Sequence, residues 1–285
     1  MKNNRDTKKL SLRTDFKGPK AVAAADLLAE LTGLSKMRIK DAMNKGAVWI
    51  LRKKGGLQRL RRASADLKPG THIELYYDEE LLSLKPPEAS CLHDQGHYSV
   101  WLKPAGLLSQ GTKYGDHCSL LRQAELYFGL RREVWLIHRL DREASGLMLI
   151  AHTKDAAGVL SELFRKDLIV KKYRLEVLGD LTARGKSGTI DLPLDDKPAV
   201  TDYEAGEYDP ARNLTPVVAV IRTGRLHQIR RHFDMIGFPV IGDPQYGTGN
   251  KNRTGMKLEA VSLSFLCPYR NENVAYTIEK DSSTF

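Results

Sequence analysis

One charged stretch lies between two apolar runs: His138-Arg139-Leu140-Asp141-Arg142-Glu143-Ala144-Ser145-Gly146-Leu147. Residues 134–137 before it and 148–151 after it are apolar, and each run is typical of a buried strand. Asp141 stands between two arginines and ahead of a Ser-Gly turn. Because a buried charge is costly unless it is paired or lies in a cleft, we expect Asp141 to be ionised there. An ionised carboxylate suits a nucleophile or an electrostatic stabiliser better than a general acid, and a structural ion pair is the alternative.

The composition is that of a water-soluble globular protein. The chain has 285 residues, of which 41% are hydrophobic and 7% aromatic, so one large domain or two unequal domains are expected. No apolar run has the length of a membrane helix, and the first residues carry no apolar signal segment. The three cysteines are far apart in the sequence, which indicates a reducing cytoplasm and no thiolate zinc site.

The excess of positive over negative charge lies entirely in the first quarter of the chain. Residues 1–76 contain 18 Lys and Arg against 7 Asp and Glu, whereas the remaining residues contain 27 against 28. This asymmetry predicts a nucleic-acid-binding appendage on a nearly neutral body. A basic surface that only aids solubility is the alternative.

The N-terminal region reads as two short helices and a small sheet. Helices are expected at 21–31, ended by Gly33, and at 36–44, capped by Ser35. Strands are expected at 47–51 and 72–77, with a basic hairpin at 52–62. The motifs at 34–40, 44–48 and 67–73 resemble the alpha-L RNA-binding domain of ribosomal-protein S-four type. Trp49 begins a departure from the usual hairpin sequence, and a small domain that binds protein is the alternative.

Strands and helices intermix after residue 97 without a regular alternation. Strands are expected at 100–102, 173–178 and 217–221, and helices at 119–130, at 155–166 with Thr153 as N-cap, and after Gly224. This pattern favours an α+β fold with a mixed, mostly antiparallel sheet and flanking helices. We expect a tail over 1–16, a small α/β RNA-binding domain over 17–80, a linker over 81–96 and a catalytic domain over 97–285.

Five motifs occur in one order along the second domain. They are Lys103-Pro104-Ala105-Gly106, the stretch 138–147, Lys172-Tyr173-Arg174-Leu175, Thr223-Gly224-Arg225-Leu226-His227-Gln228-Ile229-Arg230-Arg231-His232, and Gly242-Asp243-Pro244-Gln245-Tyr246-Gly247. In this order and spacing they resemble the RluA-type pseudouridine synthases over roughly residues 95–270. The resemblance implies an RNA-uridine isomerase that needs no cofactor, because the reaction involves no redox change and no energy source.

The resemblance also implies roles for individual residues. Asp141 would be the catalytic carboxylate, Arg225 would pair with it, and Tyr173 would stack on uracil and move a proton. Ile229 would pack beneath the pocket, and Arg139 would enter the gap left by the flipped nucleotide.

Two further residues are expected near the substrate. His138 and Lys103 are assigned to substrate binding, Lys103 in a position that orders the edge of the sheet.

Metal binding is not expected from the histidines. His227 and His232 are five residues apart, which places them on different faces of a helix, and Gly96 disfavours a helix that would bring His93 and His97 together.

Two positions depart from the family pattern. Ala144 stands where threonine is usual, and Glu259 stands where histidine is common. A less typical substrate or a slower enzyme would be compatible with both departures.

We therefore predict a cytoplasmic, monomeric RNA pseudouridine synthase that binds neither metal nor membrane. Its N-terminal domain favours ribosomal RNA over transfer RNA as the substrate. The alternatives are a non-catalytic RNA-binding or assembly protein that retains a synthase fold, and a glycosidase that acts on free nucleosides. The sequence leaves open which uridine is modified and whether Asp141 acts by nucleophilic attack or by elimination.

Overall fold

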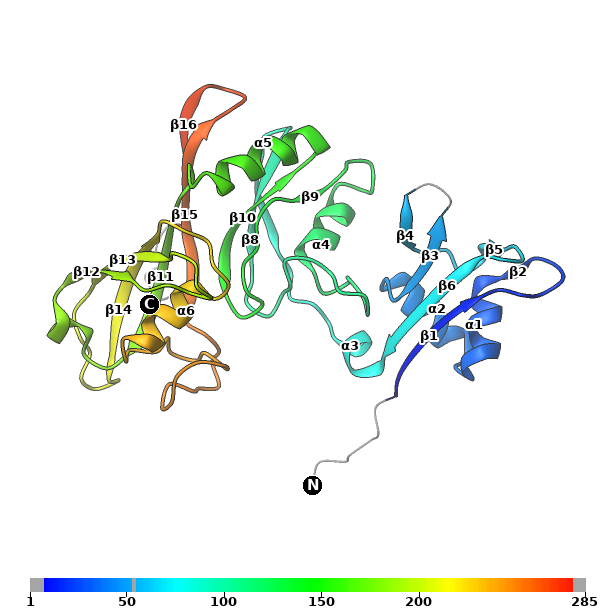
Figure 1. Cartoon of the computed structure of the whole chain (residues 1–285), viewed down its shortest axis with the longest axis horizontal. Helices are drawn as coiled ribbons and strands as arrows, with labels where there is room; N and C mark the ends of the chain where they lie inside the picture. Colours follow the sequence, from blue (N-terminus) through cyan, green and yellow to red (C-terminus); the bar gives the residue numbers. More distant parts are fainter. Residues whose placement is uncertain (1–7, 53–54, 279–285) are drawn as a thin grey trace. The chain divides into compact units, whose positions relative to one another are not determined.

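The computed structural model describes residues 8–52 and 55–278. The chain divides into two compact units (Figure 1). Unit 1 comprises Met1–Pro86 and Gln110–Arg122, and unit 2 comprises Pro87–Ser109 and Gln123–Phe285. The sequence-based boundary therefore missed one segment: Gln110–Arg122 groups with unit 1, although it follows the predicted start of the catalytic domain.

The described part of unit 1 contains a four-stranded sheet in the order β1-β6-β3-β4 and a two-stranded sheet of β2 and β5. Its strands are β1 (Lys9–Asp15), β2 (Val22–Ala23), β3 (Val48–Arg52), β4 (Gly56–Arg59), β5 (Asp66–Leu67) and β6 (His72–Asp78). Its helices are α1 (Ala24–Thr32), α2 (Lys36–Asn44) and α3 (Glu79–Ser83).

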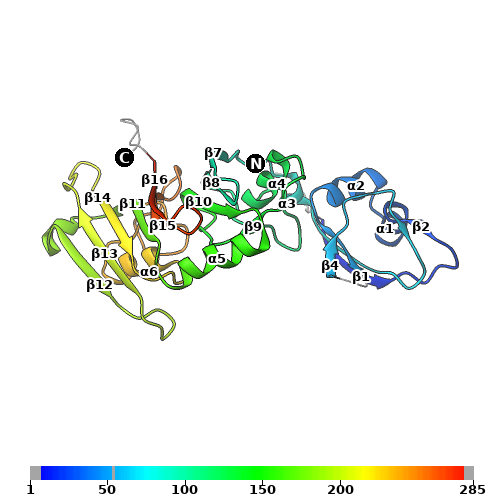
Figure 2. The same ribbon diagram turned by 90° about the horizontal axis from the view of Figure 1, so that it is seen from above.

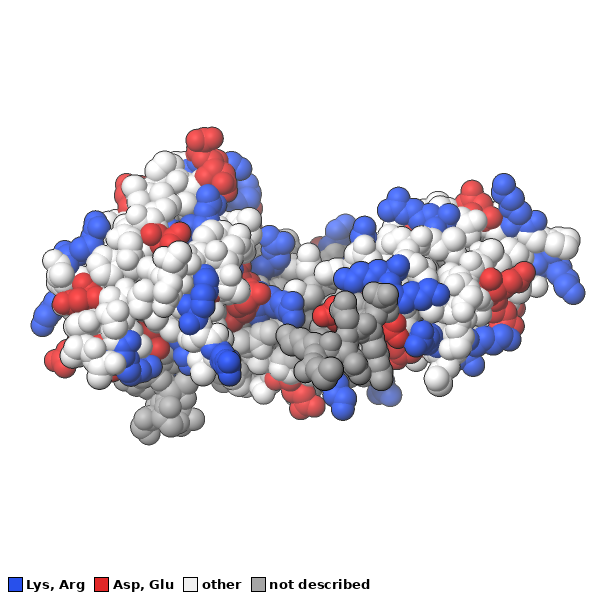
Figure 3. Space-filling model, turned by 90° about the horizontal axis from the view of Figure 1, so that it is seen from below, with Lys and Arg blue, Asp and Glu red and all other residues white. Residues whose placement is uncertain are grey.

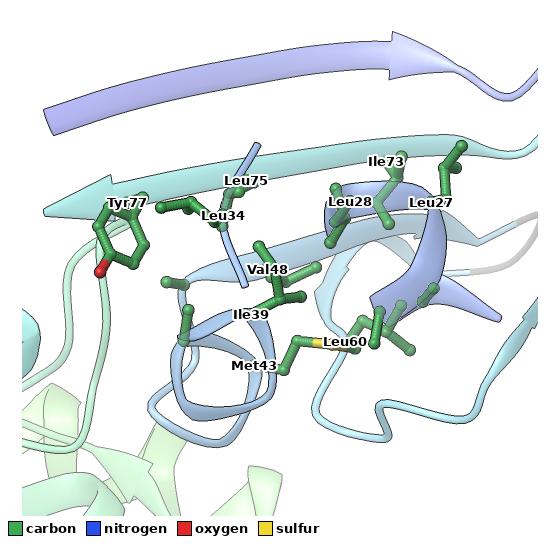
Figure 4. Packing of buried hydrophobic residues seen from close by; sticks show 14 of the residues in the cluster. Leu27, Leu28, Leu34, Ile39, Met43, Val48, Leu60, Ile73, Leu75 and Tyr77 are labelled. Carbon is green, nitrogen blue, oxygen red and sulfur yellow. The ribbon is translucent and has the colours of Figure 1, made fainter. Parts of the chain in front are cut away.

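Both predicted helix caps of unit 1 are confirmed. Gly33 ends α1 in the left-handed conformation, at φ 69°, and its N–H bonds to the carbonyl of Ala29. Ser35 caps α2 by accepting a hydrogen bond from the N–H of Arg38 at 3.3 Å. The core lies between these helices and one face of the sheet (Figure 4). The side chains labelled there are Leu27, Leu28, Leu34, Ile39, Met43, Val48, Leu60, Ile73, Leu75 and Tyr77.

The prediction of a loose tail over 1–16 is wrong for its second half. Residues 9–15 form β1, which pairs with β6 from Lys9↔Asp78 to Asp15↔His72. Their exposed polar side chains alternate with Leu10 and Leu12, which pack against the core. The high proportion of polar residues made this segment resemble a tail, although the alternation is that of a strand with one buried face. Residues 1–7 lie outside the described part.

The predicted linker over 81–96 is shorter than expected. Its first residues belong to α3, whose N-cap Asp78 accepts a hydrogen bond from Leu81 N–H at 3.1 Å. Its last residues include β7 (Ser90–Asp94), which pairs with β8 (Tyr98–Lys103) in the sheet of unit 2. Only residues 84–89 lie between these two elements.

The basic hairpin of unit 1 uses two of its arginines for internal contacts. Arg59 and Arg61 both pair with Asp116, which belongs to the segment Gln110–Arg122. Arg59 also donates to the carbonyl of Thr112 at 2.8 Å and lies over the ring of Trp49. These cations bind the returning segment, so the charge of the hairpin overstates what it can offer to RNA. Residues 53–54 of the hairpin lie outside the described part.

The described part of unit 2 contains a ten-stranded sheet (Figure 2). Its main path runs β12-β13-β14-β11-β15-β10-β8-β7, with β16 beside β15 and β9 beside β10. The strands not yet given are β9 (Trp135–Leu136), β10 (Ser145–Ala151), β11 (Val170–Leu178), β12 (Ser187–Asp191), β13 (Val200–Ala205), β14 (Leu214–Ile221), β15 (Leu258–Cys267) and β16 (Glu272–Thr277). Among the described strands only β10 and β15 pair in parallel, which confirms the mixed, mostly antiparallel sheet and the α+β class.

Helices flank this sheet as predicted. They are α4 (Leu120–Tyr127), α5 (Lys154–Arg165), α6 (Gln228–Met235) and the short 3-10 helix η1 (Leu181–Arg184). Thr153 caps α5 by accepting from Ala156 N–H at 3.0 Å, as expected. Helix α6 packs on the face that carries Leu175, Val217 and Ala219. The helix expected after Gly224 begins only at Gln228, so Leu226 lies before its first residue and is 59% exposed.

Gly146 is required where β10 and β15 meet. Its φ is 121°, and a Cβ there would lie 2.4 Å from the backbone N and O of Ala260. Any larger residue would push these strands apart next to Asp141.

We predict that Gly146→Ala lowers the free energy of unfolding by about 3 kcal/mol, because the clash is with backbone and the dihedral disfavours a side chain. Gly158→Ala is the matched control. Gly158 is exposed within α5 with open space around it, so alanine there should raise the free energy of unfolding by about 0.5 to 1 kcal/mol. Urea denaturation measures both values, and equal effects of the two variants would contradict the prediction.

Candidate active site

Asp141 lies in the loop between β9 and β10, and hydrogen bonds hold this loop on both sides of it. Ser109 Oγ donates to the carbonyl of Leu140 at 2.7 Å and accepts from its N–H at 3.0 Å. On the other side, Gly106 N–H donates to the carbonyl of Arg142 at 2.7 Å. The backbone that carries the carboxylate is therefore fixed before any substrate binds.

Lys103 is the cation beneath this loop. Its side chain is 0% exposed, and burial lowers its pKa to about 8 although the charges of Asp141 and Glu143 oppose the shift. Its Nζ lies 2.7 to 3.4 Å from four backbone carbonyl oxygens, those of Pro104, Leu107, Arg142 and Ala144. The assignment of Lys103 to substrate binding is wrong in this structure, because its donors are used by the loop. Its predicted part in ordering the edge of the sheet agrees with these contacts.

Arg230 is the partner of Asp141. Its Nη1 donates to Asp141 Oδ2 at 2.9 Å, while its Nε and Nη2 donate to the two carboxylate oxygens of Asp243 at 2.6 and 2.8 Å. Arg230 is 2% exposed, whereas the side chain of Asp141 is 23% exposed. A buried guanidinium thus binds a buried carboxylate on one side and a solvent-accessible carboxylate on the other.

The predicted pairing of Arg225 with Asp141 is wrong. Arg225 donates from Nε to the carbonyl of Pro198 at 3.0 Å, and its N–H donates to Gln228 Oε1 at 3.0 Å. The reason is the start of α6 at Gln228. Arg225 lies in the turn before the helix, and Arg230 lies inside the helix, on the side that faces Asp141. Both arginines belong to one motif, so sequence spacing did not distinguish them.

His227 is a second neighbour of Asp141 that the sequence did not predict. Its Nε2 lies 3.7 Å from Asp141 Oδ1, and its Nδ1 lies 3.0 Å from the hydroxyl of Tyr246. The residue has φ 51° and ψ 32°, a left-handed conformation that is uncommon for residues other than glycine and that clusters at functional sites. Its only sequence signal was its place beside the arginines of the motif.

Tyr173 and Ile229 pack together near Asp141, whose charge influences the Tyr173 hydroxyl. Tyr173 is partly buried, and burial together with the nearby charge of Asp141 raises the pKa of its hydroxyl far above 10. Ile229 is 4% exposed and belongs to the apolar cluster against which Tyr173 packs. The site therefore combines an ionisable carboxylate with a neutral phenol above an apolar floor.

His138 does not reach the site. Its Nε2 accepts a hydrogen bond from Leu149 N–H at 3.0 Å, and its ring stacks on Phe164 at a centroid distance of 4.2 Å. Burial lowers its pKa to about 3, with a smaller effect from Lys171, so the ring is neutral. Its predicted role in substrate binding is replaced by a structural one, which joins the start of the loop to β10.

Arg139 differs from its neighbours in being available. It is exposed and forms no hydrogen bond or ion pair within the described part of the chain. It precedes Asp141 by two residues in the same loop, so its exposed side chain is carried by the backbone that also carries the carboxylate.

The two departures from the family pattern have local explanations. Ala144 is 3% exposed and packs in the apolar cluster with Leu175 and Ile229, where a methyl group is compatible with its surroundings. Glu259 pairs with Arg174, with Nη2 and Oε2 2.6 Å apart. Neither side chain bonds to Asp141 or Arg230 within the described residues, so both departures leave the Arg230–Asp141 contact intact.

The described ranges contain neither a metal-binding cluster nor a membrane-spanning helix. No group of three or more His, Cys, Asp or Glu side chains is arranged to hold a metal ion there. Among the same residues, no helix has the length and apolar character that crossing a bilayer requires.

We predict that Arg230→Gln lowers the free energy of unfolding by about 3 to 5 kcal/mol, because it leaves the buried Asp243 unpaired. Arg225→Gln should change it by about 1 kcal/mol or less, because the side chain is partly exposed and bonds one carbonyl. Urea denaturation of both variants tests the assignment. If Arg225→Gln lowered the free energy of unfolding more than Arg230→Gln, the assignment of Arg230 as the buried partner would be contradicted.

Known proteins resemble this chain in sequence. A family model described as RNA pseudouridylate synthase matches residues 97–235. The tRNA pseudouridine synthase C of Haemophilus influenzae is 31% identical over 67% of this chain and 92% of its own length. An uncharacterized RNA pseudouridine synthase of Bacillus subtilis, YjbO, is 31% identical over 71% of this chain and 70% of its own length. The dual-specificity RNA pseudouridine synthase RluA of Vibrio vulnificus is 31% identical over 66% of this chain and 82% of its own length.

Solved structures show the same fold. Human RNA pseudouridylate synthase domain containing 1 superposes with a TM-score of 0.57 at 23% identity, over 69% of this chain and 86% of that one. This similarity concerns the fold, and the sequence relatives cover about two thirds of this chain or more. The chain belongs to the RNA pseudouridine synthase family and is an isomerase.

Proposed function

We propose that this protein converts specific uridines in structured RNA to pseudouridine, with Asp141 as the catalytic carboxylate. The observation that carries the proposal is the clamp on Asp141. Arg230 holds Oδ2 at 2.9 Å, while the side chain keeps 23% of its surface exposed. An ionised oxygen on a fixed backbone is thereby presented to a ligand.

The reaction breaks the bond between N1 of uracil and C1′ of ribose and forms a bond between C5 and C1′. The hydrogen on C5 leaves as a proton, and N1 gains a proton, so atoms and electrons balance without an oxidant or a reductant. An ionised carboxylate can attack C1′ or assist elimination across the ribose. Oδ1 of Asp141 is the oxygen that Arg230 leaves free for either role.

Tyr173 and Ile229 would hold the uracil while it turns. A neutral phenol can stack on the base and donate a hydrogen bond, and its raised pKa keeps it protonated at neutral pH. Ile229 supports Tyr173 from within the apolar cluster. This arrangement offers the flat uracil ring an aromatic and apolar surface on which it can turn.

Arg139 would occupy the gap that the flipped uridine leaves in the RNA. A base within a stack must be extruded before its sugar can be reached, and a vacated stack needs a replacement. The guanidinium of Arg139 is exposed and has no partner among residues 8–52 and 55–278, which suits this role, because arginine stacks on bases and also bonds phosphates.

Unit 1 would bind RNA as an alpha-L domain. Helix α2 presents Lys36, Arg38 and Lys40 on its exposed side, although Lys36 pairs with Asp26 and Arg38 pairs with Glu79. On the face drawn in Figure 3, Lys and Arg side chains are scattered among Asp, Glu and uncharged residues. A basic domain in addition to the catalytic one suits a large folded substrate, so we propose ribosomal RNA rather than transfer RNA. We also propose that the protein acts on this RNA in the cytoplasm.

We predict that Asp141→Asn retains the fold and RNA binding and slows isomerisation on the order of 1000-fold or more. The variant keeps the size of the side chain and removes the charge that the chemistry needs. Pseudouridine is detected by carbodiimide labelling and primer extension, and thermal unfolding reports on the fold. Product at the wild-type rate would exclude Asp141 as the catalytic group.

The RNA substrate is identified by mapping pseudouridine in total RNA from cells with and without the gene. We expect at least one uridine of ribosomal RNA to lose its modification in the deleted cells and to regain it with the wild-type gene but not with Asp141→Asn. A loss confined to transfer RNA would contradict the ribosomal assignment and leave the enzymatic one standing.

A further inference from the structure

We propose that Asp243 is a positioning residue for the reaction, because it fixes both neighbours of the Asp141 carboxylate. The inference rests on the proposed function of Asp141. Asp243 lies in the turn Gly242–Gly247, a motif to which the proposed reaction gives no role. It contacts neither Asp141 nor the space above it, so its effect must pass through other residues.

Asp243 is a fully satisfied buried carboxylate. Its side chain is 0% exposed, and its oxygens accept hydrogen bonds from Arg230 Nε and Nη2 and from the backbone N–H groups of Gln245 and Tyr246, at 2.8 and 3.1 Å. Burial opposes its ionisation, but these donors hold its pKa below the usual value. Asp243 is therefore a permanent anion that joins helix α6 to the turn.

The first consequence concerns the direction of Arg230. A guanidinium is planar, and a carboxylate that binds two of its nitrogens fixes the plane. Asp243 occupies the edge formed by Nε and Nη2, so Nη1 is left to point at Asp141 Oδ2. Without this anchor, the long side chain would have other rotamers to adopt.

The second consequence concerns His227. Asp243 binds the N–H of Tyr246, and the hydroxyl of Tyr246 lies 3.0 Å from His227 Nδ1. The opposite nitrogen of the same ring, Nε2, lies 3.7 Å from Asp141 Oδ1. The guanidinium carbon of Arg230 lies 5.1 Å from the centroid of the Tyr246 ring, which links the two arms.

Charge gives Asp243 a further effect. Arg230 is shared between two carboxylates, and Glu143 lies 4.0 Å from it. A cation held by Asp243 stabilises Asp141 less strongly than a cation that serves Asp141 alone. Because Arg230 is shared with Asp243, it orients Asp141 and neutralises its negative charge less. The carboxylate can then interact more strongly with the positive charge that develops on the ribose.

The test uses the full-length protein and RNA from cells that lack the gene, grown with uridine tritiated at C5. Since C5 loses its hydrogen on isomerisation, released tritium counts turnovers without knowledge of the target site. We expect Asp243→Asn to lower kcat on the order of 100-fold, as a displaced catalytic group does, and to leave the apparent KM for this RNA within about twofold.

Asp195→Asn is the matched control. Asp195 forms an equivalent two-bond pair with Arg231, the next residue of α6, at 2.9 and 3.0 Å, but its side chain is 68% exposed. It should retain wild-type kcat and KM. Equal losses in both variants would overturn the proposal, and so would unchanged kcat in Asp243→Asn.

Tyr246→Phe covers the case in which Asp243→Asn does not fold. It removes the hydroxyl that holds His227 and keeps the contacts between Asp243 and Arg230, so it should lower kcat with little change in melting temperature or KM. Unchanged kcat in this variant would overturn the second arm. Asp141→Asn separates the two hypotheses: if it releases tritium at the wild-type rate, the proposed function fails, whereas an inactive Asp141→Asn beside a fully active Asp243→Asn refutes only this inference.

Discussion

The sharing of one buried arginine by two carboxylates is the interaction on which the site depends. Arg230 is 2% exposed, so its charge has to be matched within the protein, and Asp243 supplies that match with 0% exposure. The pair is strong enough to leave Nη1 as a fixed donor at the edge of the buried region. Asp141 can therefore be both oriented and open to a ligand, two properties that usually conflict for an ionised group.

The loop that carries Asp141 is supported by cations and small residues rather than by substrate. The ammonium group of Lys103 donates to backbone carbonyls, and Ser109 bonds both backbone groups of Leu140. Gly146 permits the close approach of β10 and β15. These contacts connect segments that are far apart in the sequence. Their common purpose is a backbone that does not have to reorganise during the reaction.

Net charge proved a coarse guide to the N-terminal unit. The excess of lysine and arginine is real, but Arg59 and Arg61 are bound to Asp116 from a segment more than fifty residues later. Those cations contribute to the fold of unit 1. The cations of α2 are exposed, so a polyanion can reach them, although Lys36 and Arg38 also pair with carboxylates. Counting charges along the chain does not distinguish these two uses.

The sequence by itself determined the α+β class, the strands around Asp141, the caps at Gly33, Ser35 and Thr153, and the family, because periodicity, capping and motif order are local or linear properties. Only the tertiary structure decided which arginine meets Asp141. Arg225 and Arg230 share one motif, and the start of α6 between them sends one to a loop carbonyl and the other to the carboxylate. The strand over Lys9–Asp15 likewise depended on a partner, β6, that lies some sixty residues away. Pairings across such distances follow from packing, which linear spacing does not encode.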